Sequence, residues 1–169
     1  MKKKSGFTLL ELLIAVALVG IVMAFGLPSM TEFIKNDRLT TQINTLVGHL
    51  AYARSEAVLR HQPVIVCASD NQASCSSGNW ADGWIIFVDT DNNGDFSAGE
   101  VMLRVQQPLA GGNTLVSTAG NSVVYDDRGF APNSIGSFSL CDDRGPAHIK
   151  AITISNTGRV RKGGSASCV

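Results

Sequence analysis

The sequence predicts an α+β protein in which a long N-terminal helix packs against an antiparallel β-sheet. Three observations support this fold class. The chain begins with an apolar segment over residues 7–27, and an amphipathic helical pattern follows it as far as Pro63. Beyond Pro63, short apolar runs alternate with clusters of Gly, Asn, Asp, Ser and Pro, which is typical of strands joined by turns.

The apolar segment from Phe7 to Leu27 is long enough to span a membrane, since a hydrocarbon core of about 30 Å needs about twenty helical residues. It contains one carboxylate, Glu11. A charged side chain at membrane depth costs about 2–3 kcal/mol even on lenient insertion scales. Glu11 therefore needs an interaction that offsets this cost.

A basic leader precedes the apolar segment, and a small residue joins the two. An ordinary secretory signal has its small-residue cleavage site after the apolar region, whereas here Gly6 stands before it. Cleavage between Gly6 and Phe7 would remove the leader, residues 1–6, and keep the apolar helix. The lysines of the leader favour the cytoplasmic side, so we expect the rest of the chain on the outer side of the membrane.

The helical pattern continues to Pro63 with a single apolar stripe. The stripe consists of Leu39, Ile43, Leu46, Leu50, Ala53 and Ala57. Steps of three and four residues place these side chains on one helix face. Pro28 removes one helical hydrogen bond, so we expect a kink or a local loosening there. Residues 28–62 are thus predicted to form the amphipathic half of the helix, which packs on a β-rich domain over residues 63–169.

The β-rich domain is predicted to contain a series of short strands. They are Val64–Cys67, Trp84–Val88, Val101–Val105, Thr114–Ser117, Ser122–Tyr125, Ser137–Cys141 and Ile149–Ser155. No helical period appears after Pro63, and no repeat or long linker suggests a second globular domain.

The cysteines of the domain favour disulfides over a metal site. They are Cys67, Cys75, Cys141 and Cys168. None forms a Cys-x-x-Cys pair, and no histidine lies at zinc-finger spacing. An even number behind an export signal favours two disulfides in an oxidising compartment. Four cysteines allow three connectivities, of which we favour Cys67–Cys75 and Cys141–Cys168.

The charge balance and the lack of catalytic motifs limit the classes of function. The formal net charge is zero, with 14 basic and 14 acidic residues, so nucleic-acid binding would need a local basic patch. The three histidines are far apart in the sequence, and no Gly-x-Ser-x-Gly or Cys/His signature is present. We therefore expect neither an enzyme nor a required cofactor.

The segment from Asp89 to Glu100 matches the spacing of an EF-hand calcium loop. The candidate ligands are Asp89, Asp91, Asn93, Asp95 and Glu100, with Gly94 at the sixth position. The flanking residues have the pattern of strands, not of helices. The segment therefore favours a plain hairpin turn in which Asn-Gly supplies a positive φ, and Ca²⁺ binding is the alternative.

The C-terminal segment is the best candidate for binding an anion. No acidic residue follows Asp143, and the basic motif consists of Lys150, Gly158, Arg159, Arg161 and Lys162. Residues two apart share a face of an extended segment, so two guanidinium groups there can clamp successive phosphates. Glycine allows close backbone approach. The segment is the best candidate for salt-sensitive binding to a DNA backbone, and the alternative is a solvated edge or an ion-paired contact with a neighbouring subunit.

The leader and the residues after it resemble the prepilin signature of type IV pilins and type II secretion pseudopilins. The resemblance rests on the basic leader, Gly6, Phe7 and Thr8, followed by Leu-Leu-Glu-Leu-Leu. It implies cleavage after Gly6 and N-methylation of Phe7 by a prepilin peptidase. It also implies that Glu11 neutralises the N-terminal amine of a neighbouring subunit during filament assembly.

The Gly83-Trp84 strand, the Asp-rich turn and the Gly-Arg-x-Arg motif make the chain similar to the GspH/FimT group, which includes FimU-like minor pilins. This resemblance implies a minor pilin that joins other major and minor pilins through its N-terminal helix and takes part in pilus assembly. The FimT branch is implicated in DNA capture for natural transformation through such a motif. The alternative is an H-type minor pseudopilin of a type II secretion system. Either would be anchored in the inner membrane with its domain in the periplasm, and a pilin would later enter the filament, at or near its tip.

Overall fold

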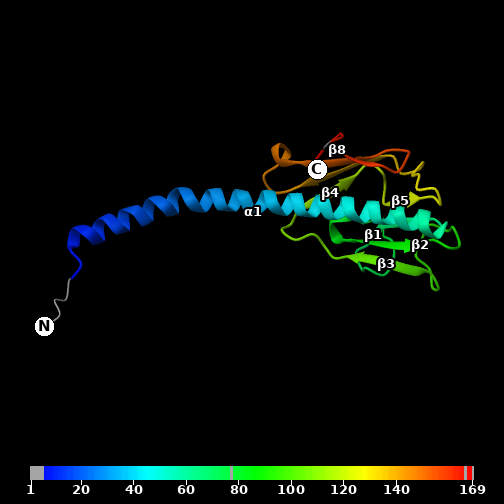
Figure 1. Cartoon of the computed structure of the whole chain (residues 1–169), viewed down its shortest axis with the longest axis horizontal. Coiled ribbons are helices and arrows are strands. Elements are labelled where there is room, and N and C mark those ends of the chain that lie inside the picture. The colour runs from blue at the N-terminus through cyan, green and yellow to red at the C-terminus, as the bar shows by residue number, and fades with distance from the viewer. Residues whose placement is uncertain (1–5, 77, 166, 169) are drawn as a thin grey trace. The chain divides into compact units, whose positions relative to one another are not determined.

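The computed structural model describes residues 6–76, 78–165 and 167–168. These residues form one long helix, α1 (Leu9–Arg60), then eight strands and two short 3₁₀ helices, η1 (Trp80–Asp82) and η2 (Pro146–His148) (Figure 1). The chain divides into two compact units, one ending at Arg38 and one from Leu39 onward. The basic leader, apart from Gly6, lies outside the described residues.

The first unit is the N-terminal part of α1. Thr8 caps its start, because the Thr8 Oγ1 accepts a hydrogen bond from the backbone N–H of Glu11 at 3.2 Å. The helix includes Pro28, whose carbonyl accepts a hydrogen bond from Thr31 Oγ1 at 2.8 Å. Residues 7–34 are all exposed. Among the described residues, α1 is the one helix long and apolar enough to cross a membrane.

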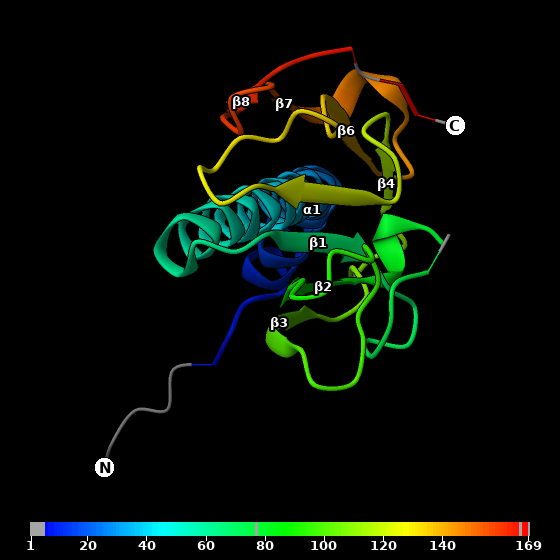
Figure 2. The same ribbon diagram turned by 90° about the vertical axis from the view of Figure 1, so that its right-hand side faces the viewer.

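The second unit contains the rest of α1 and all the strands. The six residues of the predicted apolar stripe are all buried, and Ile43 is the most exposed of them at 6%. This burial confirms the helix face that the sequence predicts. The stripe belongs to one apolar cluster with side chains from both sheets, and Figures 1 and 2 show this half of α1 between β2–β3 and β6–β8.

The strands form two antiparallel four-stranded sheets rather than one. Sheet A has the order β3-β2-β1-β5, and sheet B has the order β4-β6-β7-β8. The strands are β1 (Val64–Ala68), β2 (Trp84–Val88), β3 (Val101–Gln106), β4 (Thr114–Ser117), β5 (Ser122–Tyr125), β6 (Gly136–Cys141), β7 (Lys150–Ile154) and β8 (Val160–Lys162). The seven predicted strands all occur, each within one residue of its predicted ends. The sequence missed β8, whose three residues are too few and too basic to show an apolar alternation.

Sheet A is covered on both faces, which explains why β1 and β2 are continuous apolar runs. One face packs on α1. The other face buries Ile65, Cys67, Ile85 and Phe87, with Cys75 and Phe96 packed over them. The rings of Phe87 and Phe96 meet edge to face with their centroids 5.4 Å apart. The loop that carries Phe96 is therefore fixed to the outer face of the sheet.

The C-terminal segment crosses the outer face of sheet B. The Gly163 N–H donates to the Ala151 carbonyl at 2.8 Å, and Thr153 Oγ1 donates to the Gly163 carbonyl at 2.6 Å. Further along, the Ser167 N–H donates to Ser139 Oγ at 3.3 Å. This cover explains why the outward-facing Ser137 and Ser139 are buried.

Candidate functional site

The predicted processing and assembly residues lie at the start of the first unit. Phe7 is 80% exposed, and Glu11 is exposed in the first turn of α1. Gly6 and Phe7 precede the helix and are both exposed, so the bond between them is accessible. This arrangement leaves both the peptide bond and the Glu11 carboxylate open to other molecules.

The strand register divides the predicted basic residues between two faces of sheet B. Arg161 is paired with Thr153, and Lys162 is paired with Ile152, which is buried against the core. Residues directly opposite each other in a ladder point to the same face. Arg161 therefore lies on the outer face. Arg159 precedes β8, but its carbonyl accepts a hydrogen bond from the Ser155 N–H at 3.0 Å, which continues the pairing with β7 by one position and favours the same orientation. Lys162 lies on the opposite, core-facing side.

Lys150 and Lys162 line a groove beside α1. The groove has a volume of about 600 Å³ and includes Ile43, Val47 and Ile152 in its walls. Both lysines are exposed. The structure therefore brings the two lysines together and separates them from the arginine pair.

Gly158 is buried where two turns meet. Its φ is 71°, and a Cβ built on it would lie 2.2 Å from the Gly129 carbonyl oxygen and 3.1 Å from the Tyr125 ring. The close backbone approach that the sequence predicts for Gly158 is thus made to the protein itself. This contact fixes the turn that presents Arg159, which is exposed.

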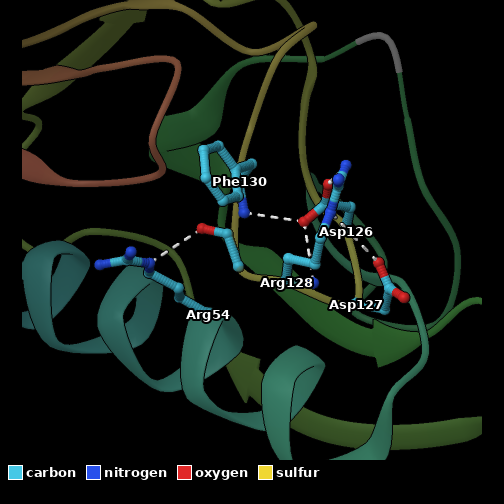
Figure 3. A network of polar contacts seen from close by, with 6 residues as sticks. Arg54, Asp126, Asp127, Arg128 and Phe130 are labelled. Atoms are coloured by element: carbon cyan, nitrogen blue, oxygen red, sulfur yellow. Dashed lines mark hydrogen bonds and ion pairs between the residues drawn. The ribbon is translucent and has the colours of Figure 1, made fainter.

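Two further arginines, which no sequence motif indicates, lie at the same place. Arg54 of α1 donates from Nε to the Gly129 carbonyl at 2.9 Å, as Figure 3 shows. Arg128 lies on the turn that Gly158 contacts and pairs with Asp126 at 3.0 Å. No pattern in the sequence connects these residues with position 158, because they meet only through the packing of α1 on the two turns.

An acidic group offsets the positive charge of Arg128. Burial acts to raise the pKa of Asp126, but hydrogen bonds from the Phe130 N–H and from Arg128 lower it overall. Asp126 is therefore ionised and offsets Arg128. In contrast, neither Arg159 nor Arg161 pairs with an acidic residue in the described part of the chain, whereas Arg144 pairs with Asp142 at 2.6 Å. Arg159 and Arg161 are therefore exposed cations without an acidic partner among the described residues.

The structure brings together part of the predicted calcium set. Carboxylate oxygens of Asp89, Asp91 and Glu100 lie within 4.8 Å of one another in the loop between β2 and β3. Asp95 instead lines a different hollow beside Cys67 and Cys75. The loop has strands on both sides, as the sequence predicts.

The four cysteines form two disulfides. Cys67 pairs with Cys75 at a Cα–Cα distance of 5.6 Å, and Cys141 pairs with Cys168 at 6.0 Å. These pairs confirm the connectivity favoured from the sequence. The first closes the short loop over sheet A, and the second ties the C-terminal segment to the end of β6.

The fold and the N-terminal motif together define a pilin-like subunit. The prokaryotic N-terminal methylation motif matches residues 1–27, which include Gly6, Phe7 and Glu11. The long α1 helix packed on antiparallel sheets is the corresponding architecture. The class is that of minor pilins and pseudopilins, which are structural subunits and not enzymes.

The chain belongs to the family of the type II transport protein GspH, whose model matches residues 42–158. The match extends from α1 through β7 and ends at Gly158. Arg159 and Arg161 therefore lie just beyond it.

Solved structures share the fold at low sequence identity. The type IV minor pilin FimU of Pseudomonas aeruginosa is 22% identical with a TM-score of 0.62, over 78% of this chain and 92% of that one. The minor pseudopilin EpsH of the Vibrio cholerae type 2 secretion system is 15% identical with a TM-score of 0.54, over 74% and 95%. Both likenesses confirm the predicted fold class.

Curated relatives match a shorter region. Two fimbrial proteins of Pseudomonas aeruginosa are 30% identical over 78 residues, which is 46% of this chain and 50% of theirs. The chain thus spans about half the length of the curated relatives it matches.

Proposed function

We propose that this chain is a minor subunit of a type IV pilus. In this proposal a prepilin peptidase cuts after Gly6 and methylates Phe7. Residues 7–27 then hold the subunit in the inner membrane and later enter the filament core, while the domain lies in the periplasm and finally near the pilus tip. The observation that carries the proposal is the exposure of the apolar segment from residue 7 to residue 27, since an apolar surface of that extent requires lipid or other apolar helices.

Glu11 supplies the assembly contact in this proposal. Its carboxylate pairs with the N-terminal amine of a neighbouring subunit, and the attraction is strong because the surroundings are apolar. We expect Glu11→Gln to insert into the membrane normally and to enter filaments several-fold less than the wild type. The measurement is an immunoblot of membrane and sheared-filament fractions.

A matched control is Glu32→Gln, the same change on the same helix. We expect it to leave incorporation at the wild-type level. Normal incorporation of the Glu11→Gln subunit would contradict the pairing argument, because only the charge has been removed.

We further propose that Arg159 and Arg161 bind the DNA backbone, which would suit a subunit that captures DNA for natural transformation. Both are exposed and share the outer face of sheet B. Two guanidinium groups two residues apart can contact successive phosphates. Lys150 and Lys162 face the groove on the other side, so they add to the local positive field and contribute less than the arginines.

The test is DNA binding by the full chain in detergent at several salt concentrations. The logarithm of the DNA association constant falls linearly with the logarithm of the salt concentration, and two phosphate contacts contribute about −1.8 to that slope. Arg159→Gln with Arg161→Gln should therefore make the slope less steep by about 1.8. The matched control is Arg60→Gln with Arg104→Gln, which removes the same charge elsewhere and should leave most of the slope. Equal losses in the two double variants would indicate a diffuse field instead of the named site.

The second candidate function is that of an H-type minor pseudopilin in a type II secretion system. The observation in its favour is the match to the type II transport protein GspH over residues 42–158. Deletion of the gene in its host separates the two functions. A pilus subunit is expected to be needed for surface pili and not for the release of secreted proteins, whereas a pseudopilin gives the opposite result.

A further inference from the structure

The loop from Asp89 to Glu100 contains a close group of carboxylates. Single oxygens of Asp89, Asp91 and Glu100 lie within 4.8 Å of one another. Like charges at that separation repel, and the repulsion grows where solvent is excluded. Asp89 is the buried member, with 4% of its surface exposed. The group is therefore costly unless a cation shares it.

Asp89 supplies a second, independent sign of a ligand. Its Oδ2 accepts a hydrogen bond from the Gly94 N–H at 3.2 Å, but its buried Oδ1 has no hydrogen-bond partner among the described residues. Burial, together with the charge of Glu100, raises the pKa of this carboxyl against the lowering effect of nearby backbone N–H groups. A buried carboxylate oxygen without a donor is strongly disfavoured unless it meets a cation.

Other contacts hold the loop in shape. Glu100 accepts hydrogen bonds from the Thr90 N–H at 2.7 Å and from the Ser97 N–H at 2.9 Å. Phe96 is fixed against Phe87 on the outer face of sheet A. Oxygens from both ends of the loop are therefore held close together by the loop itself.

We propose that residues 89–100 bind one Ca²⁺ ion through carboxylate oxygens of Asp89, Asp91 and Glu100. Asn93 and the backbone carbonyl of Asp95 stand at the spacing that completes an oxygen set around Gly94. The Asn93 amide now donates to Asp91 Oδ2 at 2.8 Å, a contact that the ion would replace. The proposal is independent of the DNA site and of the machine in which the subunit works.

The chemistry of the ligand atoms selects the ion. All of the candidate ligand atoms are oxygens, which disfavours zinc and copper. They come from one irregular loop and are mostly charged, whereas Mg²⁺ requires near-ideal octahedral geometry and retains several waters. Calcium accepts six to eight oxygens in irregular arrangements. A site of this kind needs no flanking helices, because every ligand lies within the loop.

The test is calcium titration of the full chain in detergent after treatment with a chelator. Isothermal titration calorimetry should show one site per chain, with much weaker binding of Mg²⁺. At a calcium concentration about 100 times the Kd, the midpoint of thermal unfolding should rise by about 5–10 °C.

The decisive variant is Asp89→Asn, which keeps the shape of the side chain and removes its charge. We expect this variant to lose both the heat of calcium binding and the calcium-induced rise of the unfolding midpoint. In chelator its unfolding midpoint should equal or exceed that of the wild type, because the charge repulsion is gone, so failure to fold does not confuse the result. The matched control is Asp127→Asn, an exposed carboxylate outside the loop that should keep the full calcium response.

Three results would overturn the proposal. One is the absence of heat and of a thermal shift in the wild type at millimolar calcium. The second is equal calcium binding by the wild type and Asp89→Asn, and the third is equal losses in Asp89→Asn and Asp127→Asn, since either of these would show that the ion only screens surface charge.

Discussion

A hydrogen bond between α1 and sheet A is expected to make stability depend on pH. Trp84 is fully buried on β2, and its indole Nε1–H donates to His49 Nδ1 at 3.0 Å. Burial, and to a lesser degree the charge of Arg104, lowers the pKa of His49 from its usual value. Only a neutral imidazole can accept at Nδ1. Protonation of His49 therefore breaks this bond and leaves the indole N–H without an acceptor.

The direction of the pH effect follows from proton binding. The pKa of His49 in the folded chain lies below its value in the unfolded chain, so the unfolded state binds more protons between the two values. The free energy of unfolding therefore falls as the pH falls from about 6.5 toward the lowered folded value. One proton limits this slope to about 1.4 kcal/mol per pH unit. Well above the unfolded pKa the contribution is constant.

His49→Asn tests this effect, because the amide oxygen keeps a neutral acceptor and cannot titrate. The assay is urea unfolding of the full chain in detergent at several values between about pH 5 and pH 7.5. We expect the variant to lose less stability than the wild type as the pH falls. At neutral pH, His49→Ala should cost about 1–3 kcal/mol, because it strands a buried N–H group.

His61→Asn is the matched control. His61 follows α1 with a φ of 52°, a conformation that asparagine tolerates well, so the same substitution should not disturb the fold. We expect this variant to keep the wild-type pH profile. If His49→Asn also keeps that profile, protonation of His49 does not affect stability and the reasoning is refuted.

Two further predictions concern packing. Leu50→Ala empties a fully buried position on α1 and should lower the free energy of unfolding by about 2.7–5 kcal/mol. The control Leu59→Ala changes a 74% exposed position and should alter that free energy by less than about 0.5 kcal/mol. Similar urea midpoints for the two variants would show that the stripe does not form the core. Gly158→Ala should lower the free energy of unfolding more than the matched Gly145→Ala does. Both glycines have positive φ, which costs another residue about 1–3 kcal/mol, but of the two only position 158 lacks space for a Cβ. Equal falls of the unfolding midpoint in thermal melts would exclude the clash with Gly129.

The elements of the fold could be predicted from the sequence because they depend on local patterns. The stripe from Leu39 to Ala57 has helical steps, and Pro63 follows close on the end of α1 at Arg60. The division into two sheets could not be predicted in the same way. It depends on which strands pair across long separations, such as β1 with β5, and strands in either sheet show the same apolar runs.

The candidate sites show the same limit. Two-residue spacing was enough to place Arg159 and Arg161 on one face. It could not show that Lys162 lies opposite Ile152 and points into the groove, because that depends on the register of β7 and β8. Arg54 was also beyond reach, since its contact with Gly129 joins residues 75 positions apart in the sequence.

Asp89 Oδ1 and Tyr125 Oη are buried and have no hydrogen-bond partner among the described residues, and their surroundings decide what each of these unpaired atoms means. Asp89 faces two other carboxylates, so a cation would relieve both the repulsion and the missing hydrogen bond. Tyr125 is packed in the apolar core near Arg54, and burial raises its pKa, which keeps the hydroxyl neutral. Tyr125→Phe should therefore stabilise the chain or leave its urea midpoint unchanged, because an unpaired buried polar group costs about 1–3 kcal/mol. A loss of more than about 1 kcal/mol would show that the hydroxyl has a partner and that its burial has a function.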